Sequence, residues 1–215
     1  MSTSGQSPYH HGDLRHACLL AALELLEEGD ETTLSIREVA RRAGVSANAP
    51  YRHYADKDAL LGALAVHGYE LLRKDLIAAA AQDTDGQVVA MALAYVHFAL
   101  DHPAVFRLMF GHPCNRTRPD VKDAANATSA VLAQQIQETA PKAEAEAFLL
   151  GVWAIVHGLA TLILDGKIAT DKPRTMETVV TDVVRTMTGG QLFVVPRGVE
   201  YEVFPRSVEL RRRSW

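Results

Sequence analysis

A tight turn between two short amphipathic segments constrains the fold of this chain more than any other feature. Ser35 followed three residues later by Glu38 is the pattern of a capping box, in which each side chain satisfies a backbone N–H group of the other residue. Gly44 is placed to end the helix that starts there, and Ser46 is placed to cap the next one. Residues 35–54 therefore predict a helix-turn-helix layout.

Helical segments are also expected on both sides of this pair. Asp13 is placed to cap a first helix that stops at Gly29, and Asp56 is placed to cap a longer helix. Tyr54 ends the second short helix, and we expect it to pack against the first helix rather than to contact a ligand. Three short helices and the start of a long one then form an N-terminal head at residues 12–75, preceded by a flexible arm at 1–11.

The remainder of the chain is predicted to be helical up to residue 188. Hydrophobic residues make up 48% of the 215 residues and aromatic residues only 7%, and the recurrent Ala and Leu favour packed helices. The fold class is therefore expected to be all-α, with a larger helical body at 76–188. Apolar residues at helical spacing predict helices at 86–101, 103–111, 120–139, 141–164 and 173–188, with a loop at 112–119.

The tail at 189–215 has a different pattern. Its alternation of apolar and polar residues is broken by Pro196 and Gly198, and it ends in three consecutive arginines before Ser214 and Trp215. A hairpin and a disordered extension both fit this pattern, so no structure is predicted for the tail.

The charge distribution restricts where a nucleic acid could bind. The formal net charge of the chain is −4, so DNA binding requires a local positive patch rather than a basic coat. Residues 34–57 contain such a patch. Their basic residues are Arg37, Arg41, Arg42, Arg52 and Lys57, and their acidic residues are Glu38 and Asp56, both of which have proposed capping roles.

The second short helix has small and polar residues at its leading end, as a helix that approaches base edges in the major groove requires. Asn48 could pair with adenine, and Tyr51 and His53 could reach phosphates. The alternative is that these are ordinary solvated residues of a small helical bundle. The residues predicted to contact DNA are Arg37, Ser46, Ala47, Asn48, Tyr51, Arg52, His53 and Lys57.

The stretch LSIREVARRAGVSANAPYRHYADKDALL resembles the DNA-binding head of the TetR family of regulators. The resemblance covers residues 12–75 and implies an all-helical homodimer, a palindromic operator, and repression that a small-molecule ligand relieves. It assigns contact roles to Arg37, residues 46–48, Tyr51, His53 and Lys57. Pro50 departs from the small or β-branched residue that is commoner in the family.

The body contains Trp153, His157 and Gly158, which resemble the tryptophan–histidine–glycine signature of one TetR-like C-terminal class. Trp153 and His157 are four residues apart and share a helix face, and Gly158 would let another helix approach closely. These side chains could line a ligand pocket, or they could form a packed core with a hydrogen-bonded histidine. The candidate pocket residues are Phe98, Phe106, Met109, Phe110, Trp153 and His157.

Dimerisation is expected to use the last two long helices, near residues 145–165 and 173–188. The stripe of Val179, Val180, Val183 and Met187 could bury against its copy in a four-helix interface. The same stripe could instead face the core of its own subunit.

Several other classes of protein receive no support from the sequence. It has no catalytic motif such as G-x-S-x-G or a P-loop, so an enzyme is not expected, and the remaining alternative is a helical protein that binds another protein. No run is expected to approach the roughly 18 apolar residues of a membrane span. The arm lacks a signal peptide, so the protein is expected in the cytoplasm.

No metal or cofactor is expected. His97, Asp101, His102 and His112 could converge on a metal, but their spacing alone does not establish a site. The neighbouring His10 and His11 lie in the flexible arm and are weak candidates. Cys18 and Cys114 are far apart, which fits a reducing compartment.

Overall fold

The computed structural model describes residues 11–29, 32–81, 86–112, 117–139, 142–170 and 175–189. Within these residues the chain forms eight α-helices, one short 3-10 helix and no strand, which confirms the predicted all-α class. The helices are α1 (His11–Glu28), α2 (Ile36–Arg42), η1 (Pro50–Arg52), α3 (Lys57–Ala80), α4 (Gln87–Asp101), α5 (Pro103–Gly111), α6 (Pro119–Thr139), α7 (Lys142–Leu164) and α8 (Met176–Thr188).

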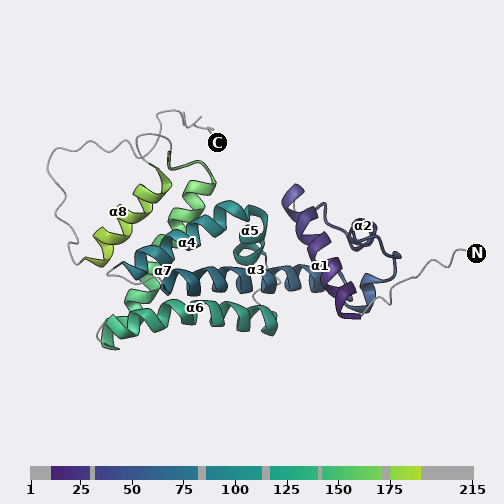
Figure 1. The fold of residues 1–215 in the computed structure, drawn as a ribbon, viewed down its shortest axis with the longest axis horizontal. Helices are drawn as coiled ribbons and strands as arrows, with labels where there is room; N and C mark the ends of the chain where they lie inside the picture. Colours follow the sequence, from purple (N-terminus) through teal and green to yellow (C-terminus); the bar gives the residue numbers. More distant parts are fainter. Residues whose placement is uncertain are drawn as a thin grey trace, which may run out of the picture.

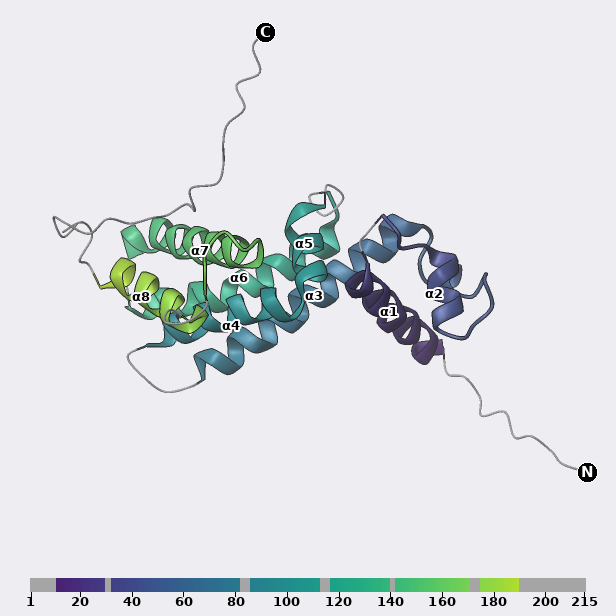
Figure 2. The same ribbon diagram turned by 90° about the horizontal axis from the view of Figure 1, so that it is seen from above.

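The molecule is elongated, with two groups of helices joined by α3 (Figures 1 and 2). We call α1, α2, η1 and the first half of α3 the head. The body consists of α4–α8 and the second half of α3. The predicted domain boundary at residue 75 falls inside α3, so one continuous helix belongs to both parts. Any displacement of this helix in the body therefore reaches the head directly.

The predicted caps explain where the head helices begin and end. Ser35 Oγ accepts the backbone N–H of Glu38 at 3.2 Å, and a carboxylate oxygen of Asp56 accepts that of Ala59 at 2.7 Å. Gly44 has a φ of +68°, the left-handed conformation that favours glycine after a helix. Only half of the predicted capping box forms, because the Glu38 carboxylate binds the Arg41 guanidinium instead.

The segment predicted as the second short helix is a turn followed by the 3-10 helix η1. Ala49 donates its backbone N–H to the Ser46 carbonyl oxygen at 2.9 Å, and His53 donates to that of Pro50 at 2.9 Å. An α-helix starting at Ser46 would need residue 50 to donate to the Ser46 carbonyl, and proline has no N–H group to donate. Tighter hydrogen bonds between residues three apart therefore replace the expected α-helix.

The first helix also begins earlier than expected. It starts at His11, so Asp13 lies inside α1 and is not its cap. Its end at Glu28, immediately before Gly29, agrees with the prediction. Tyr54 is only 2% exposed and donates its hydroxyl hydrogen to the Arg15 carbonyl oxygen of α1 at 3.0 Å, which confirms its predicted place against the first helix.

The body helices follow the predicted ranges closely. Gly166 ends α7 with a φ of +65°, and the Lys167 N–H group donates to the Leu162 carbonyl oxygen at 2.8 Å. The last helix, α8, starts at Met176 rather than residue 173, with the Thr175 side chain as its cap. The predicted start at Pro141, residues 113–116 of the predicted loop and the tail from residue 190 lie outside the described residues.

Helix α7 is more apolar than expected from the sequence. The stretch Ala145–Leu164 is long and apolar enough to span a membrane, so the expectation that no segment approaches this length was wrong. Only 28% of that stretch is buried, although α7 packs against α4, α6 and α8. Leu150, Trp153 and Leu162 are 60%, 43% and 44% exposed. The helix therefore has apolar residues on the face that packs within the body and on the face that does not.

Candidate nucleic-acid interface and body cavity

The tip of the head presents the residues predicted to meet DNA bases. Ser46, Ala47 and Asn48 are exposed in the turn before η1, and the Tyr51 side chain is 48% exposed. Buried Pro50 and Tyr54 on either side of Tyr51 anchor the segment in the head. Exposed side chains of this short segment thus lie on a backbone that the core holds in place.

The cations around this tip fall into two groups. Among the described residues, the exposed side chains of Arg37 and Arg52 make no ion pair or hydrogen bond. Lys57 makes one long contact, from Nζ to the Thr32 carbonyl oxygen at 3.4 Å. No carboxylate in the described part of the chain pairs with these three cations, so their charge remains available to a phosphate.

The other two arginines are already paired. Arg42 contacts carboxylate oxygens of Glu28 at 2.6 Å and Glu24 at 3.4 Å, and Arg41 pairs with Glu38. The hydrogen bond from Arg42 lowers the pKa of Glu28, and that from Arg41 lowers the pKa of Glu38. The positive patch is therefore smaller than the count of basic residues at 34–57 indicated.

His53 occupies an intermediate position. The residue is partly buried, and its Nε2 atom is buried without a hydrogen-bond partner among the described residues. In this structure that nitrogen does not face the solvent beside Tyr51.

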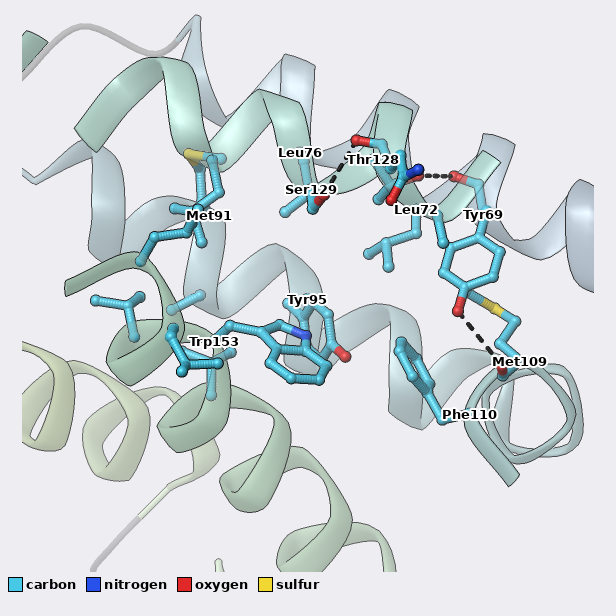
Figure 3. Close-up of a pocket in the computed structure, with 18 of the residues that line it drawn as sticks. Tyr69, Leu72, Leu76, Met91, Tyr95, Met109, Phe110, Thr128, Ser129 and Trp153 are labelled. Atoms are coloured by element: carbon cyan, nitrogen blue, oxygen red, sulfur yellow. Dashed lines mark hydrogen bonds between the residues drawn. The ribbon is translucent and has the colours of Figure 1, made fainter. Parts of the chain in front are cut away.

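The body contains a cavity of about 730 Å³ that is partly open to solvent, with walls from α3, α4, α5, α6 and α7 (Figure 3). Its lining is mainly apolar, with rings and sulfur atoms on several sides and the hydroxyl groups of Thr128 and Ser129 on α6. Of the predicted pocket residues, three line the cavity: Met109, Phe110 and Trp153. Two further aromatic residues, Tyr69 and Tyr95, also line the cavity, and sequence reasoning did not single them out.

The other three predicted pocket residues, Phe98, Phe106 and His157, do not line the cavity. Phe98 is 2% exposed, and Phe106 stacks on the His157 ring with centroids 5.4 Å apart. His157 Nδ1 lies 2.9 Å from the Tyr95 hydroxyl, and burial lowers the pKa of His157. The neutral imidazole can thus accept the Tyr95 hydroxyl hydrogen, in the manner of a hydrogen-bonded core histidine.

Much of the cavity wall comes from α3 and α6, which sequence reasoning did not identify as pocket elements. The Thr128 hydroxyl donates to the Tyr69 carbonyl oxygen at 3.0 Å. The Tyr69 hydroxyl in turn donates to the Met109 carbonyl oxygen at 3.3 Å (Figure 3). Burial raises the pKa of Tyr69 to about 12. Apolar residues at helical spacing look the same in a sequence whether they face a cavity or a filled core.

Two further expectations concern glycine and metal. A Cβ atom at Gly158 would meet nothing within 4 Å, so within the described part of the subunit no helix approaches that glycine closely. Among the residues that the structure describes, no three His, Cys, Asp or Glu residues are grouped to hold a metal ion. His97 instead lies near Glu177 of α8, with Nε2 and the carboxylate oxygen 3.9 Å apart.

Comparisons with known proteins match both parts of the chain. A family model of bacterial regulatory proteins, tetR family, matches residues 19–64, and one described as tetracyclin repressor-like, C-terminal domain, matches residues 88–187. A solved structure of a protein with unknown function from Rhodococcus sp. RHA1 is 34% identical, covers 85% of this chain and 97% of its own, and has a TM-score of 0.73.

More distant neighbours share the fold. A TetR variant from Acinetobacter baumannii AYE, in complex with minocycline, is 22% identical, with a TM-score of 0.58 over 82% of this chain and 94% of that chain.

Among curated sequences, an HTH-type transcriptional regulator of Mycobacterium tuberculosis is 34% identical over 99 residues, which are 44% of this chain and 42% of that protein. The aligned part of this chain thus spans less than half the length of the curated relatives it matches.

Proposed function

This chain belongs to the TetR family of DNA-binding transcriptional regulators, and we propose that it is a homodimeric repressor that a small molecule releases from a palindromic operator. The observation that carries the DNA-binding part is the exposed tip of residues 46–48 and Tyr51, on a chain of net charge −4. Arg37 and Arg52 flank it and have no ion-pair partner among the described residues.

In this proposal the head uses phosphates for position and bases for specificity. Asn48 pairs with an adenine edge, while Tyr51, Arg37 and Lys57 bind phosphates on either side. Arg52 can serve either purpose. The N-terminus of α3, which begins at Lys57, adds a partial positive charge beside the same phosphates. His53 joins the phosphate contacts if its ring turns out of the head.

The exposed apolar face of α7 supports a dimer. Leu162 lies on it, two helical turns after the partly buried Ile155, and Val183 and Met187 of α8 are only partly buried within one subunit. A second copy packed on α7 and α8 would remove this surface from water and form a four-helix interface. The two heads would then meet successive major grooves about 34–36 Å apart.

The cavity supports a small-molecule effector. Its volume of about 730 Å³ lies within the range of roughly 300–1,000 Å³ of small-molecule sites, and its lining is mainly apolar and aromatic. We propose a largely apolar ligand that contacts Phe110, Trp153 and Met109. Its occupancy would favour a head spacing that no longer fits the operator, for which a coupling of about 1–3 kcal/mol suffices.

The test is selection of genomic DNA fragments with the purified protein. We expect an inverted repeat, and binding to it that weakens as salt is added. Substitution of Tyr51 by alanine should weaken operator binding by about 1.5–3 kcal/mol, the worth of a hydrogen bond to a charged group. Leu20→Ala, at a comparably exposed position on α1, is the control. Absence of any salt-sensitive preference among fragments would refute the proposal.

A further inference from the structure

A carboxylate of the head caps a helix of the body. Glu27, near the end of α1, accepts the backbone N–H of Ala104 at 3.2 Å and that of Val105 at 3.3 Å. Both N–H groups belong to the first turn of α5. The other side-chain hydrogen bonds described for α1, between Glu24 or Glu28 and Arg42 and from Tyr54 to Arg15, stay within the head.

Helix α5 needs this contact because it has no cap of its own. The first N–H groups of a helix lack partners inside the helix, and His102, which precedes α5, makes no side-chain cap. Pro103 supplies no N–H group. A carboxylate at this end also meets the positive pole of the helix dipole. The Glu27 contact therefore combines charge-assisted hydrogen bonds with a favourable interaction with that dipole. In a helix of only nine residues, the first turn is a large part of the element.

The other end of α5 forms part of the cavity wall. Met109 and Phe110 line the cavity, and the Met109 carbonyl oxygen accepts the Tyr69 hydroxyl. Helix α5 also packs tightly on α3, because a Cβ atom at Gly68 would lie 2.5 Å from Val105 Cγ1 and 2.6 Å from Met109 Sδ. A ligand that pushes α5 outward at Met109 and Phe110 would therefore also move the N–H groups that Glu27 holds.

We propose that Glu27 is the positioning residue that transmits occupancy of the cavity to the DNA-binding head. The inference rests on the proposed function, since it assigns one residue to the coupling that effector release requires. With the cavity empty, the carboxylate fixes α1 against the first turn of α5. When a ligand shifts α5, α1 moves with it, and the head leaves the orientation that fits the operator.

The test compares operator affinity of the full-length protein with and without saturating anilinonaphthalene sulfonate, a fluorescent dye with an apolar ring system. Glu27→Ala removes the contact, and Glu27→Gln keeps the shape and one acceptor oxygen, should the alanine variant be poorly folded. Glu24→Ala is the matched control, because this exposed carboxylate lies on the same helix and, among the described residues, pairs only with Arg42, at 3.4 Å. Thermal melting establishes that each variant is folded.

We expect the dye to weaken operator binding of the wild-type protein and of Glu24→Ala at least about five-fold, the lower end of typical allosteric coupling. For Glu27→Ala the effect should fall below about two-fold, and Glu27→Gln should lie between them. An equal response of Glu27→Ala and wild type would overturn this inference and leave the proposed function standing. A wild-type protein that binds operator regardless of dye would overturn effector release itself, and this inference with it.

Discussion

Arg41 and Arg42 lie in the same short helix as Arg37, yet their charges are paired with carboxylates and, among the described residues, that of Arg37 is not. Arg42 reaches Glu24 and Glu28 on α1, whereas Arg37 points to solvent without a partner. The positive patch could be found from the sequence because its residues are close along the chain. The pairing could not, because it depends on which face of α2 packs against α1.

Single residues with local signals were predicted well. Ser35, Gly44, Asp56 and Tyr54 have the roles expected of them, because caps, turns and a helix-end aromatic depend on neighbours a few residues away. His157 shows the limit of such reasoning. Its hydrogen bond comes from Tyr95 on another helix, so only the structure separates it from the cavity lining.

His157 predicts a pH dependence of stability. Its folded-state pKa is lowered by burial, so the unfolded chain binds the proton more readily, and the stabilisation is present above the unfolded value of about 6.5. It is lost as the pH falls through the lower folded-state pKa. We therefore expect the melting temperature to fall more steeply between about pH 7 and pH 5 for wild type than for His157→Gln. Parallel melting curves for the two proteins would contradict this account.

At the scale of elements, the spacing of apolar residues and the helix caps were enough to predict the body helices. Their ends lie within three residues of the predicted ones wherever the structure describes them. The segment before Tyr54 was predicted as the wrong kind of helix, because Pro50 supplies no N–H group to the Ser46 carbonyl oxygen. In so short a segment that donor is one of very few, and its absence leaves a turn and η1. Whether the α3 and α6 residues face a cavity depends on helix spacing, which no sequence pattern records.

The close packing of α5 on α3 predicts the effect of Gly68→Ala. The added methyl group would overlap with Val105 and Met109, so α5 must shift away from α3. We expect a loss of about 1–3 kcal/mol from overpacking, partly offset by about 1 kcal/mol of improved helix propensity. Gly111→Ala, where the methyl group meets nothing within 4 Å, should leave stability unchanged or slightly raised. Chemical denaturation measures both, and equal stabilities would refute the tight contact.

At the scale of the whole molecule, the apolar face of α7 predicts where subunits associate. Leu162→Glu places a charge at a position that is 44% exposed in one subunit and should shift the protein towards monomer. Ile77→Glu on α3, where the side chain is 45% exposed, is the control and should leave association unchanged. Sedimentation velocity distinguishes them. Loss of the dimer in both variants, or in neither, would exclude α7 as the interface.

The central claim is that an anionic protein binds DNA through the few cations of its tip that no carboxylate neutralises. Its most direct test is the salt dependence of operator affinity for wild type, Arg37→Ala and Arg41→Ala. Each phosphate contact contributes about −0.9 to the slope of log affinity against log salt concentration. Arg37→Ala should reduce that slope by about one contact, whereas Arg41→Ala, whose charge already pairs with Glu38, should leave it nearly unchanged. Equal slopes for all three proteins, or a loss in Arg41→Ala alone, would contradict the claim.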